Sequence, residues 1–351
     1  MEWVAAHLLA AVGLGRGQPT PSAAVGPPEA RPRLRTRGRT GARLRRWTAR
    51  VLLALVAVLV VGTAAMVRGD LAAAEVEARW ADPPSQFVEV DGMRVHVRER
   101  GSGPPLLLVH GSGSSLFTWD GWAAELSGAY RVIAFDLPGH GLTGPHPEDR
   151  YSRADMAEFV DHLATALGVV RFSLAGNSMG GHVAALYALG HPERIEKLIL
   201  VDAYGLHREE PPPLIFRLAG LPLLGNLLTL VSPRFLVAAS VRDVYGDPGK
   251  VGSALVDRYH DLLRRTGNRE AMRIQFSGPE QELDATQLAN LRMPVLILWG
   301  ARDRWILPKY GERLRDAIPG ARLIMFPALG HVPMEEDPVA TARAVREFLH
   351  P

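Results

Sequence analysis

Apolar and polar positions recur in a regular order from Gln86 to the C-terminus. Short apolar runs end in glycine-rich turns, as buried parallel strands do, in PPLLLVHG, RVIAFDLPGHG and RFSLAGNS. Amphipathic stretches such as SRADMAEFVDHLATALG lie between these runs and predict helices. Before them, FVEVDGMRVHVRERG predicts an antiparallel hairpin with Asp91 and Gly92 at its turn. The pattern predicts an α/β fold, with a mostly parallel sheet flanked by helices on both faces.

This alternation is interrupted between residues 204 and 291. The segment opens with three prolines, Pro211 to Pro213, and continues as LIFRLAGLPLLGNLLTLVSPRFLVAAS, which is apolar without the period of a strand. We interpret it as a mostly helical cap inserted over the carboxyl ends of the strands. The core is then built from residues 86–203 and 292–351.

The first eighty residues have a different pattern. Nine arginines and no acidic residues fall between Arg31 and Arg50, and VLLALVAVLVVGTAAMV follows with no charge in 17 residues. At 1.5 Å per residue this apolar run reaches roughly 25 Å, the short end of a membrane span. We therefore expect a disordered Arg-rich cytoplasmic leader at 1–50, a transmembrane signal anchor at 51–67 and a linker at 68–85. The catalytic domain would lie outside the cytoplasm; the alternative is a secreted protein released by signal-peptide cleavage near Thr63 to Ala65.

Charge and composition narrow the possible functions. The whole chain carries a formal charge of +3, but residues 1–50 hold ten of the 40 basic and two of the 37 acidic residues, so 30 basic against 35 acidic remain. The body is mildly acidic at −5, and no nucleic-acid partner is expected. With no cysteine in the chain, neither a disulfide nor a thiolate nucleophile is possible. No metal-ligand cluster, dinucleotide fingerprint or phosphate loop is present, so we expect no metal and no cofactor.

A candidate nucleophile lies in SLAGNSMGGHVAALY. Ser178 stands between Gly176 and Gly180, where a strand pattern stops and a helical pattern starts. Gly-x-Ser-x-Gly at such a junction is a nucleophile elbow, a sharp turn that exposes the serine oxygen above the sheet. Side chains at Gly176 and Gly180 would clash at that turn.

A serine hydroxyl needs a base to remove its proton, and the base needs an acid to orient it. In this type of fold the three residues follow in the order Ser, acid, His. Asp303 follows the run LILWGAR, and His331 follows LIMFPALG. We favour Asp303 as the acid, although Asp202 at the end of LILVDA is a rival.

Negative charge that develops on a substrate oxygen needs backbone N–H donors already aimed at it. One is expected at Met179, directly after the nucleophile, and the other at Ser112 in the turn after LLLVHG. We interpret His110 and Gly111 as residues that shape this loop, with Asn177 supporting the elbow. His140 and His182 are interpreted as structural.

Together these residues resemble the α/β-hydrolase superfamily. The motifs HGSG at 110–113, DLPGHG at 136–141, GNSMGG at 176–181, WGARD at 299–303 and GH at 330–331 follow in family order. The resemblance implies Ser178 as nucleophile, Asp303 as acid, His331 as base, and Ser112 with Met179 as oxyanion donors.

The subfamily is less sharply indicated. HGSG and GNSMGGH resemble carbon–carbon hydrolases of aromatic degradation, which usually carry Trp where this chain has Val332. GHVPMEEDP is closer to esterases, lipase-like enzymes and cofactor-free haloperoxidases. The leading hypothesis is a membrane-tethered serine hydrolase that cleaves a small-molecule carboxylic ester with an apolar portion. The alternatives are hydrolytic carbon–carbon cleavage of meta-cleavage-type products and a non-catalytic binding protein on a hydrolase scaffold.

Overall fold

The computed structural model describes residues 38–211, 217, 221, 225–226, 229–278 and 282–350. The chain divides into two compact units, Met1–Val58 and Leu59–Pro351. The described part of the first unit belongs to helix α1 (Gly38–Met66), and its side chains at 45–58 are exposed. The prediction of a disordered leader as far as residue 50 is therefore wrong for residues 38–50, because Ala, Arg and Leu in this stretch favour helix. Residues 1–37 lie outside the described part of the chain.

Among the described residues, no helix combines the length and the apolar character needed to cross a bilayer.

The second unit is built on one eight-stranded sheet in the order β1-β2-β4-β3-β5-β6-β7-β8. The first two strands form the predicted hairpin, with Asp91 and Gly92 both at positive φ in its turn. Strand β2 pairs antiparallel with β4, and every later pairing is parallel. The strands are β1 (Ser85–Val90), β2 (Met93–Arg100), β3 (Pro105–Val109), β4 (Arg131–Phe135), β5 (Phe172–Asn177), β6 (Ile195–Val201), β7 (Val295–Gly300) and β8 (Arg322–Phe326).

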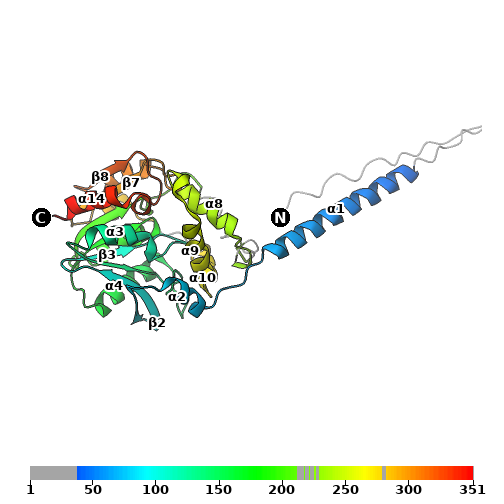
Figure 1. Cartoon of the computed structure of the whole chain (residues 1–351). Helices are drawn as coiled ribbons and strands as arrows, with labels where there is room; N and C mark the ends of the chain where they lie inside the picture. Colours follow the sequence, from blue (N-terminus) through cyan, green and yellow to red (C-terminus); the bar gives the residue numbers. More distant parts are fainter. Residues whose placement is uncertain are drawn as a thin grey trace, which may run out of the picture. The chain divides into compact units, whose positions relative to one another are not determined.

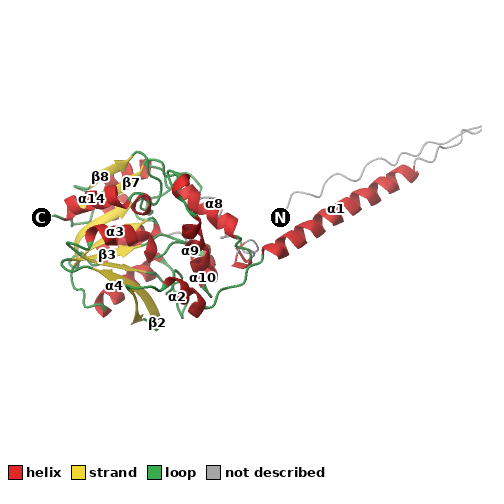
Figure 2. Ribbon diagram, in the orientation of Figure 1, coloured by secondary structure: helices red, strands yellow, loops and turns green. Residues whose placement is uncertain are grey.

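Helices cover both faces of this sheet (Figure 2). Because side chains alternate along a strand, Leu107 and Val109 of β3 enter one apolar cluster, and Leu106 and Leu108 enter the other. The first cluster is completed by α4 (Arg153–Ala166), α5 (Met179–Gly190), α11 (Ala285–Leu288) and α12 (Lys309–Ala317). The second is completed by α2 (Ala73–Trp80), α3 (Asp120–Leu126), α13 (Pro333–Glu336) and α14 (Pro338–Leu349). The α/β-hydrolase type of sheet with flanking helices is thus confirmed.

The chain between β6 and β7 supplies the insertion. Its main helices are α8 (Arg234–Val244), α9 (Ser253–Arg264) and α10 (Asn268–Ser277), which lie together at one side of the sheet (Figure 1). Short 3-10 turns occur at Leu116–Trp119 and Pro248–Lys250.

The segment predicted as a linker at 68–85 is ordered and packed in the structure. It contains α2, whose Val76 is fully buried, and Leu71 forms an isolated parallel bridge with Arg265. The backbone N–H of Leu71 donates to the carbonyl of Arg264 at 2.8 Å. Sequence reasoning missed this because its polar and alanine-rich pattern gives no strand or long-helix period.

Candidate active site

Ser178 occupies a strained turn between β5 and α5. Its backbone has φ 54° and ψ −118°, a left-handed conformation that a residue with a side chain rarely adopts. A Cβ on Gly176 would come within 2.1 Å of the carbonyl oxygen of Gly180, and one on Gly180 within 2.3 Å of the Val109 carbonyl oxygen. The two glycines let strand and helix approach closely enough to hold Ser178 at the turn, as the sequence predicted.

His331 and Asp303 form a buried pair. Nδ1 of His331 lies 2.7 Å from Oδ2 of Asp303, and the two side chains are 5% and 0% exposed. The other carboxylate oxygen of Asp303 accepts the backbone N–H groups of Trp305 at 2.7 Å and Ile306 at 3.0 Å. The carboxylate is held on both oxygens, so the imidazole ring is held by a fixed partner.

The loop that carries His331 is fastened from two sides. Asn177 donates from Nδ2 to the carbonyl of His331 at 3.0 Å and to that of Val201 at 3.1 Å. The backbone N–H of His331 donates to the carbonyl of Val244 in α8 at 2.7 Å. Asn177 therefore links the base of the elbow to the histidine loop.

Ser178 and His331 line the same cavity of about 1090 Å³. Gly111, Ser112, Asn177 and Met179 line it too, so all the predicted residues on the substrate side come together. Helices α8, α9 and α10 contribute further walls, which include Val241, Tyr259 and Gln275.

The two expected oxyanion donors are neighbours. Met179 is the first residue of α5, where backbone N–H groups are free to bind an anion. The hydroxyl of Ser112 donates to the sulfur of Met179 at 3.1 Å, which brings the two loops together. A Cβ on Gly111 would stand 3.1 Å from Cβ of Ser178, so this loop passes directly over the elbow.

His110 has a structural role. Nδ1 lies 2.8 Å from the Gly111 carbonyl and Nε2 accepts the backbone N–H of Leu137 at 3.0 Å. Burial lowers the pKa of His110 below its ordinary value, although Asp136 and the Gly111 carbonyl act in the opposite direction. A neutral ring with Nδ1 protonated satisfies both contacts and leaves no nitrogen for catalysis.

Asp202, the rival acid, lies beside the pair. One atom from each of Asp202, Asp303 and His331 lies within 4.8 Å of the others. Burial raises the pKa of Asp202 well above its ordinary value, and the charge of Asp303 raises it further. Asp202 also accepts the backbone N–H of Gly300 at 2.9 Å. The raised pKa favours the protonated form of Asp202, and Asp303 is the acid hydrogen-bonded to His331. Among the described residues, Asp202, Asp303 and His331 are also close enough together to share a metal ion. However, Nδ1 of His331 already makes a hydrogen bond with Asp303.

Sequence reasoning missed Glu336. Its buried carboxylate accepts the backbone N–H groups of Gly246 at 2.8 Å, Asp247 at 2.9 Å and Gly330 at 2.8 Å. It therefore fixes the turn before His331 to the end of α8. The signal was present as three consecutive acids, Glu335, Glu336 and Asp337, directly after the apolar run VPM in GHVPMEEDP.

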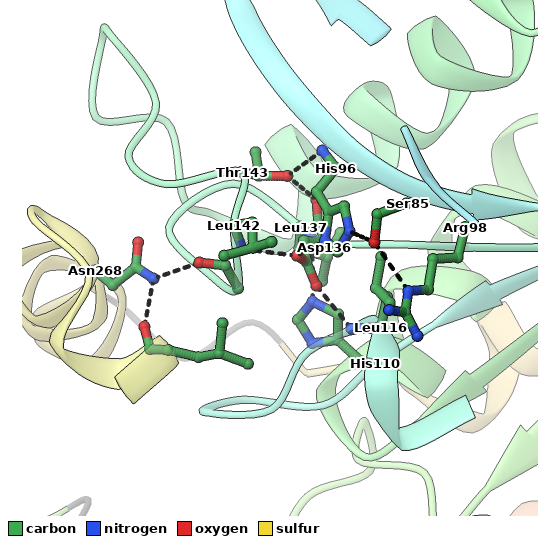
Figure 3. Close-up of polar contacts among 12 residues, drawn as sticks. Ser85, His96, Arg98, His110, Leu116, Asp136, Leu137, Leu142, Thr143 and Asn268 are labelled. Atoms are coloured by element: carbon green, nitrogen blue, oxygen red, sulfur yellow. Dashed lines mark hydrogen bonds and ion pairs between the residues drawn. The ribbon is translucent and has the colours of Figure 1, made fainter. Parts of the chain in front are cut away.

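A second buried histidine–aspartate pair was also missed (Figure 3). We call Ser85, His96, Arg98 and Asp136 the His96 cluster. Nδ1 of His96 lies 2.7 Å from Oδ2 of Asp136, and Nε2 lies 2.8 Å from Oγ of Ser85. Asp136 belongs to the quoted motif DLPGHG, but nothing in that motif indicates a histidine on β2 as its partner.

Asp136 fixes loops around the active site. Its oxygens accept the backbone N–H groups of Leu116 at 2.7 Å and Leu142 at 2.8 Å. Burial acts to raise the pKa of Asp136, but the charge and hydrogen bond of His96, together with His110 and the Leu116 N–H, hold it below its ordinary value. The ionised carboxylate ties β2 to the chain that follows the predicted oxyanion loop.

With this geometry established, comparison with known proteins identifies the family. The family model described as alpha/beta hydrolase fold matches residues 104–338. The chain belongs to the alpha/beta hydrolase family. An uncharacterized protein of Mycobacterium tuberculosis is 32% identical over 293 residues, covering 77% of this chain and 82% of the relative.

Two further members of the family bear on chemistry. A 2-hydroxy-6-oxononadienedioate/2-hydroxy-6-oxononatrienedioate hydrolase of Cupriavidus pinatubonensis is 30% identical, covering 79% of this chain and 99% of the relative. The crystal structure of a membrane phospholipase A, a bacterial virulence factor, matches with a TM-score of 0.67 and 30% identity, covering 88% of this chain and 98% of that one. This alpha/beta hydrolase thus has similar relatives that differ in their named substrates.

Proposed function

We propose that this alpha/beta hydrolase is a membrane-tethered serine hydrolase that cleaves a carboxylic ester with an apolar portion. The observation that carries the proposal is that Ser178, on a strained elbow, and His331, bonded to Asp303, line one large cavity. Leu221, Leu236 and Val237 line the same cavity, which suits an acyl or alkyl chain.

The proposed reaction has two steps. Nε2 of His331 takes the hydroxyl proton of Ser178 while Oγ attacks the ester carbonyl, and the N–H groups of Met179 and Ser112 stabilise the oxyanion. The protonated His331 then gives its proton to the leaving alcohol, which departs and leaves an acyl-enzyme. A water activated by His331 releases the carboxylic acid and restores Ser178. Asp303 stabilises the imidazolium that forms in each step.

The proposed tether rests on the sequence. The uncharged run 51–67 follows an arginine-rich segment with no acidic residue between Arg31 and Arg50, the arrangement of a signal anchor with its N-terminus in the cytoplasm. We propose a catalytic domain outside the cytoplasm on this basis, with secretion after cleavage as the alternative. The similarity to a membrane phospholipase A is a second support.

A second candidate is hydrolytic carbon–carbon cleavage. Two observations favour it: the Cupriavidus relative is named as a 2-hydroxy-6-oxononadienedioate hydrolase, and this chain carries the GNSMGG motif. Arg208, Arg217 and Arg273 also line the cavity and suit a substrate that carries carboxylates.

Hydrolysis of p-nitrophenyl esters of graded acyl length by the full chain tests the proposal, with Ser178→Ala as the control. We expect turnover that peaks at one chain length and is lost in the variant, together with loss of fluorophosphonate labelling. A folded wild-type chain that hydrolyses none of the esters but bleaches a coloured dienol substrate would establish the carbon–carbon reaction instead. If it does neither and Ser178 stays unlabelled, a binding role on a hydrolase scaffold replaces both.

A further inference from the structure

Residues 68–71, here called the strap, are bound closely to the cap. The backbone N–H of Arg68 donates to the carbonyl of Leu230 at 3.0 Å. Arg264 donates from Nε at 3.0 Å and from Nη2 at 2.8 Å to the carbonyl of Gly69. Thr266 donates its backbone N–H to the carbonyl of Leu71 at 2.9 Å. The strap is therefore part of the cap rather than a free connection.

A buried arginine locks the strap to the cavity wall. Arg269 is 7% exposed and donates from Nη2 to Oδ1 of Asp70 at 2.6 Å and to the carbonyl of Arg68 at 2.8 Å. Its Nη1 donates to Oγ of Ser232 at 2.7 Å, and both Arg269 and Ser232 line the cavity. One side chain thus joins the strap, the cap segment that ends at Ser232 and the substrate cavity.

The strap also fixes where the apolar segment ends. Helix α1 ends at Met66, two residues before Arg68. Since consecutive Cα atoms are about 3.8 Å apart, the end of that helix lies within roughly 8 Å of the Arg68 Cα. The C-terminal end of the apolar run 51–67 therefore lies close to Leu230 and the cap.

That part of the cap exposes large apolar side chains. Leu230 is 54% exposed, Phe235 57%, Leu221 50% and Leu236 41%, and Val67 beside the strap is 44% exposed. Leu221 and Leu236 line the cavity that also reaches Ser178 and His331. We call Leu221, Leu230, Phe235 and Leu236 the cap face.

The charge pattern around the cap face selects one kind of partner. From residue 211 to residue 242 the sequence contains three arginines, Arg217, Arg234 and Arg242, and no acidic residue. Of these, Arg234 is paired with Asp257 of α9 at 2.5 Å. Arg68 adds a further exposed arginine at the strap. Apolar side chains flanked by arginines are typical of surfaces that lie on bilayers with anionic lipid headgroups.

We propose that the cap face docks onto a lipid bilayer and that the cavity takes its ester substrate from that bilayer. This inference rests on the proposed membrane tether and ester substrate, and extends them by naming the surface and the source of substrate. The strap holds the cap face beside the end of the apolar segment, so tethering and docking place the mouth of the cavity at the lipid surface.

The cysteine-free sequence allows a direct test in the full chain. Leu230→Cys and Phe235→Cys, each labelled with a polarity-sensitive fluorophore, are reconstituted into phosphatidylcholine–phosphatidylglycerol vesicles, with and without brominated lipid. The matched control is Val170→Cys, which is 74% exposed and precedes β5, at the opposite end of that strand from Ser178. None of these three residues lines the cavity. We expect brominated lipid to quench most of the emission at positions 230 and 235 and to leave position 170 unchanged.

Several outcomes would overturn the proposal. Emission at 230 and 235 that matches position 170 in vesicle-bound protein would exclude docking of this face. A blue shift that depends on protein concentration in detergent alone would assign the face to a second copy of the chain. A full chain that does not float with vesicles would exclude both tether and docking.

Activity provides a separate readout. The double variant Leu230→Glu/Phe235→Glu is expected to lose hydrolysis of a vesicle-embedded long-chain ester while it retains hydrolysis of a soluble short-chain ester. Equal retention of both activities would contradict substrate uptake from the bilayer. If wild type hydrolyses neither ester but is quenched at 230 and 235, the proposed reaction fails while docking stands.

Discussion

Two buried histidine–aspartate pairs in this molecule have nearly the same geometry. Nδ1 of His331 lies 2.7 Å from Asp303, and Nδ1 of His96 lies 2.7 Å from Asp136. Each aspartate also accepts two backbone N–H groups, those of Trp305 and Ile306 for Asp303 and those of Leu116 and Leu142 for Asp136. Distance and burial of the pair alone do not separate a catalytic role from a structural one.

The second ring nitrogen separates them. Nε2 of His96 is 2.8 Å from Oγ of Ser85, which also accepts Nε of Arg98 at 3.0 Å. His331 instead lines the large cavity beside Ser178, and none of Ser85, His96 and Asp136 lines that cavity. Access to the cavity, and not the histidine–aspartate pair itself, therefore distinguishes His331 as the candidate base.

The sharpest test exchanges each acid for its amide. Asp303→Asn should reduce kcat/KM by about 10³–10⁴-fold, because the amide cannot stabilise the imidazolium and favours the wrong tautomer. Asp136→Asn should instead lower the free energy of unfolding by about 3–5 kcal/mol, since it breaks a buried pair that also binds two backbone N–H groups. Ester hydrolysis and urea unfolding of both variants measure the two effects. The comparison fails if the two variants lose activity and stability in the same proportion.

The sequence predicts the residues around His331 and Asp303, but it does not predict the His96 cluster. The Gly-rich elbow at Ser178 and the strand ends before Asp303 and His331 are local patterns tied to known turns, and local patterns can be read from the chain. The His96 cluster depends on the register between β2 and β4, where Val97 faces Phe135. Such pairing between distant strands leaves no signal in the spacing of residues.

The strap illustrates the same limit. Its contacts with Arg264 and Arg269 join residues about two hundred positions apart, and its own sequence, Arg-Gly-Asp-Leu, predicts only a linker. The predicted end of the disordered leader at residue 50 was wrong for a different reason. Arginine-rich composition suggests disorder, but arginine is also a good helix former, and the structure has helix from Gly38.

Asp202 provides the next test, since His331 has a second carboxyl nearby. Its raised pKa means that the folded state holds a proton that the unfolded state releases above about pH 4. The stability of the wild type should therefore fall, relative to Asp202→Asn, as pH rises from about 4 through the folded pKa. Urea unfolding across this pH range measures the difference, with the exposed Asp316→Asn as control. A difference between wild type and Asp202→Asn that does not vary with pH would show that Asp202 is ionised in the folded protein.

His182 shows what a buried histidine does without an acid. Burial lowers the pKa of His182 to about 3, and neither ring nitrogen has a hydrogen-bond partner within the described residues. The folded state therefore keeps the ring neutral while the unfolded state binds a proton below about pH 6.5. The stability of His182→Leu relative to wild type should therefore be about 2 kcal/mol greater at pH 5 than at pH 8. Thermal unfolding at the two pH values measures the gain, and His207→Leu, at an exposed histidine, serves as control.

The smallest loss of stability is expected when the serine beside His96 is removed, and Ser178, which lines the cavity with His331, provides the matched comparison. Ser85→Ala should cost about 1 kcal/mol of stability, because it removes the oxygen that contacts Nε2 of His96 and Nε of Arg98, and should leave ester hydrolysis unchanged. Ser178→Ala should instead abolish ester hydrolysis and leave stability nearly unchanged, because it removes the proposed nucleophile without breaking a buried contact. A fluorophosphonate should label wild type and Ser85→Ala equally. Labelling of Ser85 in the Ser178→Ala variant would mean that the His96 cluster is open to substrate, and the distinction drawn between the two pairs would then be wrong.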